Sequence, residues 1–137
     1  MHWVKPYSSL KAANVLSTVS AIKLCGTGKA KKFAFISSTS ALDNDYYEEM
    51  SDLSLASGGR GVSESDDMQG GKQGLPTGYG QSKWVSEQLT FEARRRGLST
   101  SVLRAGYVLG AAQTGSMHIL LRQPQYGISL TSNSHEH

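Results

Sequence analysis

The chain has 137 residues, of which 38% are hydrophobic, and this length suits one domain with a modest core. Its formal net charge of +3 is weak and its basic residues are mostly scattered, so the composition argues against nucleic acid as a partner. No run approaches the roughly 18 apolar residues of a membrane span, and a single cysteine excludes an internal disulfide and a Cys/His metal set, so a reducing, cytoplasmic location is the default expectation.

The first third of the chain predicts one helix and one strand. Residues 8–25 carry a broad apolar stripe at helical spacing, with serines at its start and Gly26 at its end. Cys25 belongs to this pattern and is expected to be a small core residue. Residues 33–37 form a short run rich in Phe and Ile, which is typical of a buried strand.

The middle of the chain, residues 43–77, is predicted to be mostly irregular, with a short helix around 46–53. Such a long span is usually functional or disordered. Its acidic block at 64–67 could be mistaken for a metal site, but no histidine lies near it in sequence, so we expect a solvated loop and no bound metal. The glycine-rich stretch at 70–74 follows no predicted strand, so we reject it as a phosphate cradle.

The last predicted elements are a helix over 79–96 and a strand over 101–104, separated by Gly97 as a helix stop. Alternation of helix and strand predicts an α/β fold with a parallel sheet. In such sheets ligands bind beyond the carboxyl ends of the strands, so Thr39, Tyr79 and Arg104 should converge on one crevice. The core candidates on the helix are Trp84, Val85, Leu89 and Phe91.

Tyr79 and Lys83 are the residues that carry chemistry. Four positions apart on a predicted helix, they project from the same face. A fixed positive charge beside a phenol favours the phenolate, so such a tyrosine can exchange a proton with a carbonyl oxygen near neutral pH. Taken alone the spacing is a common surface coincidence, and the hydroxyl residues that end the preceding strand make the catalytic interpretation the better one.

Five blocks of sequence, in order, resemble one family. They are similar to the thioester reductase domain of fungal-type L-2-aminoadipate reductases, within the extended short-chain dehydrogenase/reductase superfamily. The resemblance covers roughly residues 2–115. The blocks are HWVKPY at 2–7, NVLST at 14–18, FISSTS at 35–40, ESDD at 64–67 and GYGQSKW at 78–84.

The resemblance implies hydride transfer from NADPH to an acyl thioester on the phosphopantetheine of a carrier domain, with release of an aldehyde. Tyr79 would donate the proton to the oxyanion, and Lys83 would hold the nicotinamide ribose. Thr39 would bind the thioester oxygen, although Ser38 or Ser40 could do so instead. Asn14 would steady a water linked to the lysine, or would be an ordinary mid-helix residue bonded to neighbouring backbone.

The same resemblance implies a cofactor wall at the end of the last strand. The family usually has proline where this chain has Ala105, and because proline fixes φ, alanine could loosen the wall. The predicted cofactor-binding residues are Tyr79, Lys83, Ser38, Arg104, Ala105, Gly106, Tyr107 and Val108.

No glycine fingerprint of the dinucleotide-binding type follows a strand near the start of the chain. We therefore expect residues 1–115 to be a partial NAD(P)-binding thioester reductase domain, a Rossmann-like doubly wound sheet without its N-terminal nucleotide-binding strands. Residues 116–137 diverge from the family and are expected to form a disordered tail. The expected acyl group is aminoadipyl, although the sequence does not fix it.

Two other functions remain open at this stage. One is a sugar-nucleotide epimerase or dehydratase, which shares the hydroxyl, tyrosine and lysine set but is not expected to carry the HWV and ESDD blocks. The other is a non-catalytic module that docks a carrier domain, because a weakly basic surface would suit an acidic partner.

Overall fold

The first part of the chain forms one helix in three sections. In the computed structural model, which describes residues 4–106, an α-helical turn α1 (Tyr7–Leu10) leads into a π-helical section η1 (Lys11–Leu16) and then into α2 (Ser17–Cys25). The predicted helix over 8–25 is confirmed. Its predicted apolar stripe is only partly buried, since Val15 is buried while Leu24 remains 66% exposed.

Two parallel strands form the sheet, as the sequence predicted. Strand β1 (Lys32–Ser38) pairs with β2 (Ser99–Ala105) in a register that sets Ser37 opposite Arg104. Strand β1 is two residues longer than predicted and β2 is three residues longer, and their carboxyl ends lie at the same edge of the sheet. The α/β fold class is therefore confirmed.

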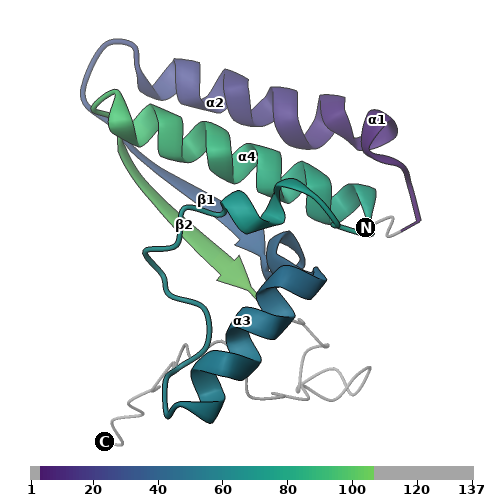
Figure 1. Ribbon diagram of the computed structural model, residues 1–137. Coiled ribbons are helices and arrows are strands. Elements are labelled where there is room, and N and C mark those ends of the chain that lie inside the picture. Colours follow the sequence, from purple (N-terminus) through teal and green to yellow (C-terminus); the bar gives the residue numbers. More distant parts are fainter. Residues whose placement is uncertain (1–3, 107–137) are drawn as a thin grey trace, which may run out of the picture.

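Helix α4 (Gly78–Arg95) connects the two strands and packs along them (Figure 1). The predicted helix is confirmed, and Gly97, with φ +94°, follows its end. The predicted core positions are wrong in part, because Trp84, Val85, Leu89 and Phe91 are only half-buried. The fully buried positions of this helix are instead polar: Ser82, Ser86, Glu87 and Thr90.

The segment between β1 and α4 is more ordered than the sequence predicted. A 3₁₀ turn η2 (Thr39–Leu42) is followed by α3 (Asp45–Ala56), which is longer than the short helix expected there, and later by a second 3₁₀ turn η3 (Gln69–Lys72). Asn44 explains this order, because its side chain caps α3 at the Tyr47 amide and donates to the carbonyls of Gly70 and Gln73. Figure 1 shows α3 beyond the carboxyl ends of both strands.

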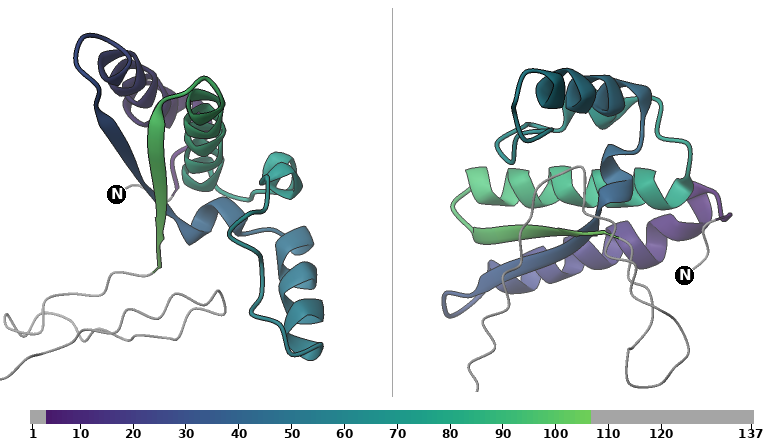
Figure 2. Two further views of the ribbon diagram at one scale, coloured as in Figure 1. Left: turned by 90° about the vertical axis from the view of Figure 1, so that its left-hand side faces the viewer. Right: turned by 90° about the horizontal axis from the view of Figure 1, so that it is seen from below.

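The hydrophobic core lies between this segment and α4. It consists of Ala41, Leu42, Tyr47 and Met68, with Trp84 packed against it. Viewed from below, α4 lies between the strands and the segment that contains α3 and η3 (Figure 2). The indole of Trp84 donates to the Met68 carbonyl at 2.6 Å, which ties the segment to the helix.

Asp66, from the predicted acidic loop, has a structural partner. Its carboxylate accepts a hydrogen bond of 2.6 Å from the buried Tyr47 hydroxyl and another of 2.8 Å from the Met68 amide. Burial, and then the hydrogen bond to Asp66, raise the pKa of Tyr47 well above its ordinary value. Within residues 4–106, no three His, Cys, Asp or Glu side chains gather as a metal site would require.

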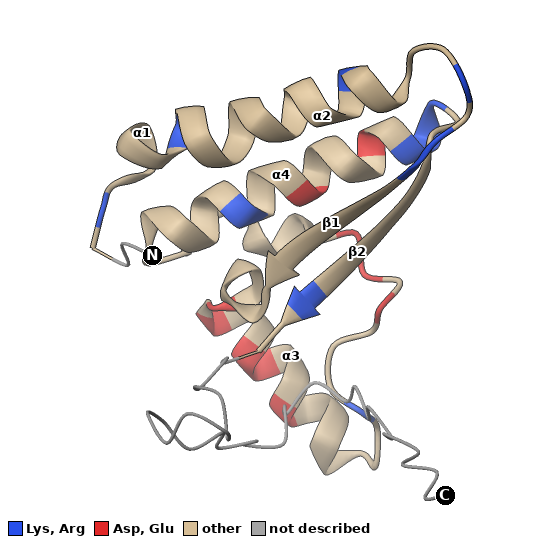
Figure 3. Ribbon diagram, turned by 180° about the vertical axis from the view of Figure 1, so that it is seen from behind, with Lys and Arg blue, Asp and Glu red and all other residues tan. Residues whose placement is uncertain are grey.

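Charge is divided between the two ends of the described fold (Figure 3). Lys and Arg gather where α2 turns into β1 and where α4 turns into β2, whereas α3 carries acidic residues. Cys25, predicted as a core residue, is only half-buried because it is the last residue of α2. Across residues 4–106, none of the helices combines the length and apolar character needed to cross a membrane.

Candidate catalytic site

Tyr79 lies in the first turn of α4, close to the turn that follows β1. The helix is capped by Thr77, whose hydroxyl accepts a hydrogen bond of 3.0 Å from the Gly80 amide. A Cβ atom on Gly80 would lie 2.5 Å from the Ser40 carbonyl oxygen, and one on Gly78 would lie 2.4 Å from the Tyr7 amide nitrogen. Two glycines therefore let the backbone on either side of Tyr79 approach its neighbours closely, and Tyr79 itself is 8% exposed.

Lys83 lies one helical turn later and faces the sheet. Its ammonium nitrogen donates to the Ile36 carbonyl of β1 at 2.8 Å, lies 5.0 Å from the centre of the Phe35 ring and lies 5.6 Å from the centre of the Tyr79 ring. Burial lowers the pKa of Lys83, and the negative charge of Glu87 opposes that shift. The predicted pairing of cation and phenol is therefore present, with the cation held against strand β1.

The hydroxyl residues after β1 form a tight turn beside this pair. Ser38 is the cap of η2, since its oxygen accepts from the Ser40 amide at 3.2 Å, and the Ser38 hydroxyl donates to that of Ser40 at 3.2 Å. Thr39 is the first residue of η2 and is half-buried. Ser38 thus donates its proton to Ser40, which makes it the weakest of the three candidates for donating to a substrate oxygen, whereas Thr39 and Ser40 remain candidates.

Glu87 and Arg104 form an ion pair behind the lysine. The Arg104 guanidinium at the end of β2 donates to both carboxylate oxygens of Glu87 at 2.7–3.1 Å. The side chain of Glu87 is fully buried and that of Arg104 is 17% exposed. Arg104 was predicted to bind the cofactor, and the structure shows its side chain on Glu87, so any contact with a nicotinamide would come from the backbone of this strand end.

Asn14 contacts the turn that joins Tyr79 to Lys83. Its side-chain amide donates to the Ser82 hydroxyl at 2.9 Å, and Ser82 in turn donates to the Tyr79 carbonyl at 2.8 Å. The Asn14 carbonyl lies in the π-helical section and accepts from Thr18 and Ser86 at 2.8 and 3.1 Å. Such sections are frequent at functional sites. The role predicted for Asn14, through a water, stays a prediction, and its direct contact is with Ser82.

Most of the predicted site residues come together. Tyr79, Lys83, Ser38, Thr39 and the backbone of residues 104–106 lie on α4 or at the carboxyl ends of the two strands, as expected. The predicted cofactor residues Tyr107 and Val108 lie outside the described residues, as do His2, Trp3 and the segment 116–137.

Sequence reasoning missed Glu87, Ser37 and Gly80. Glu87 could have been found by extending the spacing of Tyr79 and Lys83 by four more residues. Ser37 carries a buried hydroxyl that has no hydrogen-bond partner among residues 4–106, at the position opposite Arg104. A buried unpaired hydroxyl at the end of a strand marks a place where a water or a ligand atom could bind.

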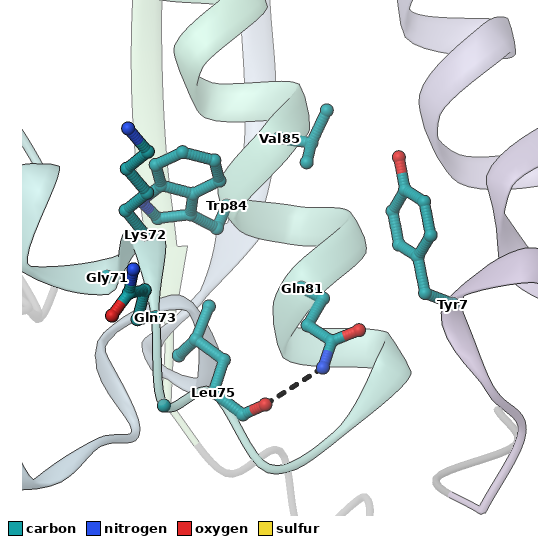
Figure 4. A pocket seen from close by; sticks show the side chains of 9 residues that line it. Tyr7, Gly71, Lys72, Gln73, Leu75, Gln81, Trp84 and Val85 are labelled. Carbon is teal, nitrogen blue, oxygen red and sulfur yellow. Dashed lines mark hydrogen bonds between the residues drawn. The ribbon is translucent and has the colours of Figure 1, made fainter.

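A pocket lies on another side of α4 (Figure 4). Helix α4 contributes Gln81, Trp84 and Val85 to it, and neither Tyr79 nor Lys83 lines it. The Gln81 amide donates to the Leu75 carbonyl at 2.9 Å across the pocket, and Tyr7 faces it from α1. The pocket is thus distinct from the site at the strand ends, and it is lined by α1, α4 and residues 71–75.

The glycines at 70 and 71 are explained by packing. A Cβ on Gly70 would lie 2.1 Å from the ring of Tyr46, and one on Gly71 would lie 2.6 Å from the indole of Trp84. Both belong to the 3₁₀ turn η3, which follows Met68 in a left-handed conformation with φ +64°. Because Gly70 and Gly71 have no side chains, η3 can pack directly against these two aromatic rings.

Comparison with known proteins supports a reductase. A sequence model of an NAD-binding family, described as male sterility protein, matches residues 1–132. The chain is 58% identical over 116 residues to the L-2-aminoadipate reductase large subunit of Penicillium chrysogenum and 49% identical over 118 residues to L-2-aminoadipate reductase of Schizosaccharomyces pombe. These matches cover 85% and 86% of this chain but 8% of each relative.

A solved structure agrees with the sequence matches. The terminal R domain of the myxalamid PKS-NRPS biosynthetic pathway is 34% identical, with a TM-score of 0.66, over 86% of this chain and 27% of that one. The resemblance predicted from the five sequence blocks is confirmed by these relatives.

Proposed function

The chain belongs to the NAD-binding family described as male sterility protein, and on that premise we propose that Tyr79 and Lys83 are the catalytic pair of an NADPH-dependent reductase of carrier-bound acyl thioesters. The observation that carries the proposal is the geometry of this pair. The Lys83 ammonium lies 5.6 Å from the Tyr79 ring, and both residues lie beside the carboxyl end of β1.

The residues of the chain would act on the substrate oxygen. Tyr79 would donate its phenolic proton to the oxygen of the thioester carbonyl as negative charge develops there. Lys83 favours the resulting phenolate through its positive charge, because it is held near the ring by the Ile36 carbonyl. The Thr39 hydroxyl would donate a second hydrogen bond to the same oxygen, from the start of η2.

The cofactor fits one half of this site. Tyr79 and Lys83 would hold the ribose next to the nicotinamide, and the backbone of residues 104–106 would line the ring. Bound there, NADPH would supply the hydride that reduces the thioester carbon. Among residues 4–106 we find no glycine-rich turn between a strand and a helix that would hold the two phosphates, since Gly70 and Gly71 are occupied by aromatic packing.

The substrate and the partner belong to the same proposal. The relatives named L-2-aminoadipate reductase suggest an aminoadipyl thioester, whose carbonyl would be reduced to the aldehyde with release of the phosphopantetheine thiol of a carrier domain. The chain spans about 8% of those relatives, so we propose that residues 1–115 are part of a larger reductase domain in the cytoplasm. We propose no role for residues 116–137.

A chimera tests this function directly. The 116-residue segment of the Penicillium chrysogenum enzyme that matches this chain would be replaced by the chain's own residues, and NADPH oxidation would be followed with an aminoadipyl thioester on the carrier domain. We expect turnover in the chimera and a loss of about 100-fold or more in Tyr79→Phe and Lys83→Met, as for removal of a general acid and its charge partner.

The matched control is Tyr46→Phe, because Tyr46 is half-exposed on α3 and lies away from the pair. Turnover that survives Tyr79→Phe unchanged, in a chimera that folds, would show that this tyrosine is not the proton donor. A folded chimera that oxidises a nucleotide sugar and leaves the thioester untouched would favour the epimerase-like alternative.

A further inference from the structure

Glu87 is a buried carboxylate to which the proposed mechanism gives no role. It lies one helical turn after Lys83 and two turns after Tyr79, so the three side chains follow one side of α4. Its residue exposure is 0%, and its two oxygens are held by the Arg104 guanidinium at 2.7–3.1 Å. A carboxylate buried to this degree is costly unless it is paired and hydrogen-bonded.

The Glu87–Arg104 ion pair and Lys83 are held by neighbouring positions of the two strands. Lys83 donates to the Ile36 carbonyl, and the next residue of β1, Ser37, lies opposite Arg104 in the ladder. Arg104 then binds Glu87, which lies one turn of α4 after Lys83. The lysine thus contacts β1 directly, and the next titratable residue on its side of the helix is fixed to β2 by the ion pair.

Lys83 has few groups that can stabilise its charge. On its own helix, Tyr79 and Glu87 lie one turn before and after it. From β1, the Phe35 ring and the Ile36 carbonyl face it. Arg104 of β2 binds Glu87. Of these, Glu87 carries the negative charge, and it opposes the effect of burial on the lysine. A carbonyl and two rings alone would leave a half-buried ammonium with weaker compensation.

We propose that Glu87, fixed by Arg104, is a positioning residue for Lys83: the negative charge of its buried carboxylate, one helical turn away, stabilises the Lys83 ammonium beside Tyr79 and β1. The proposal rests on the proposed function in one respect only, which is the catalytic use of the charged lysine. The electrostatic link itself concerns residues of this chain alone, with no cofactor or substrate involved.

The test is the titration of Lys83 in the 137-residue chain. Lysine labelled with ¹³C at Cε would be followed by NMR across alkaline pH, and Lys83→Arg would identify the signal by its loss. In Glu87→Gln we expect Lys83 to titrate at lower pH than in the parent, because the opposing negative charge is removed. Glu92→Gln is the matched control, since Glu92 lies on the same helix and pairs with exposed arginines, and it should leave Lys83 unchanged.

A double variant separates the loss of the Glu87 charge from the effect of an unpaired Arg104. In Glu87→Gln alone, Arg104 loses its partner, and its unpaired charge would also push the Lys83 titration down. In Glu87→Gln with Arg104→Gln both charges are gone, a change that buried pairs often tolerate, so this variant also serves if the single one does not fold. We expect Lys83 still to titrate below the parent. A midpoint equal to that of the parent in the double variant would overturn the proposal.

Discussion

Helix α4 buries polar side chains on two of its sides, and the two sides have different roles. The side that faces the sheet carries Tyr79, Lys83 and Glu87. The Lys83 ammonium donates to a carbonyl of β1, and the Glu87 carboxylate pairs with Arg104. The side that faces the first helix carries Ser82 and Ser86, whose hydroxyls meet those of Thr18 and the amide and carbonyl of Asn14.

The sheet side buries charged groups, whereas the helix side buries small uncharged groups in close contact. On the sheet side, long side chains place charges where a substrate oxygen and a nicotinamide would lie, and the ion pair with Arg104 compensates for burial. On the helix side, small side chains let two helices approach and satisfy each other's polar groups without any charge. We infer that the first side supplies the chemistry and that the second holds the helix in place. Four substitutions test this division.

The largest loss of stability is expected for Arg104→Ala. It leaves the fully buried Glu87 carboxylate without its partner, which should cost about 3–5 kcal/mol of the free energy of unfolding. Urea unfolding followed by circular dichroism measures it. Arg95→Ala is the control, because that residue pairs with Glu92 at an exposed site and should change stability by about 1 kcal/mol or less. Equal losses in the two variants would contradict a special role for the buried pair.

The next effect is expected for Gly80→Ala. The added Cβ would lie 2.5 Å from the Ser40 carbonyl oxygen, so the turn after β1 must move away from Tyr79. We expect a loss of about 1–3 kcal/mol in stability, as for other overpacked sites, measured by the same unfolding experiment. Gly106→Ala, where no atom of the described residues 4–106 lies within 4 Å of the new Cβ, should be nearly neutral and serves as the control.

On the helix side, Ser86→Ala should have a smaller effect. It removes the hydrogen bond of 3.1 Å to the Asn14 carbonyl in a fully buried position, with an expected loss of about 1–2 kcal/mol in the free energy of unfolding. Ser20→Ala removes an exposed hydroxyl from α2 and should cost less. In the chimera, Ser86→Ala should retain catalysis, and a loss of turnover as large as that of Tyr79→Phe would break the division between the two sides.

The smallest effect concerns Tyr47, which belongs to α3 and lies on neither of these sides of α4. Its pKa is raised in the folded state by burial and by Asp66, so the folded chain keeps this proton at pH values where the unfolded chain loses it. The contribution of Tyr47 to stability is therefore complete below pH 10.0, its ordinary value, and falls as the pH rises above it.

Tyr47→Phe removes this dependence. At neutral pH the variant should lose about 0.5–1.5 kcal/mol of stability with the hydrogen bond. Unfolding curves measured from pH 8 to pH 11, roughly the range around the ordinary tyrosine pKa, should show a shallower alkaline decline than the parent. Parallel declines in parent and variant would contradict this assignment.

The sequence predicted the sheet side of the site well because its signals are local. Tyr79 and Lys83 are four residues apart on one helix, and Thr39 directly follows a predicted strand, so topology alone brings them to one edge. The Glu87–Arg104 pair could not be predicted with the same ease. Its members are 17 residues apart, on a helix and on the following strand, and pair only through the packing of α4 on the sheet.

The polar helix side escaped prediction for a different reason. Apolar spacing was taken as the sign of burial, so Trp84 and Leu89 were expected in the core, whereas Ser82, Ser86 and Thr90 occupy the fully buried positions. Small hydroxyl residues at helical spacing give no hydrophobic signal, yet they are buried wherever a second helix approaches closely. The order of residues 39–75 likewise depends on Asn44 and Asp66, whose hydrogen bonds join positions far apart in sequence.

The most direct test of a nicotinamide site at Tyr79 and Lys83 is a fluorescence titration of the 137-residue chain with two ligands, NADPH and reduced nicotinamide mononucleotide. We propose that Tyr79, Lys83 and the backbone of residues 104–106 hold the nicotinamide and its ribose, and residues 4–106 offer no glycine-rich cradle for the remaining phosphates. We therefore predict saturable, similar binding of both ligands, weaker than low micromolar, and its loss in Lys83→Ala. Binding that Lys83→Ala leaves unchanged, or no binding of either ligand, would contradict the account.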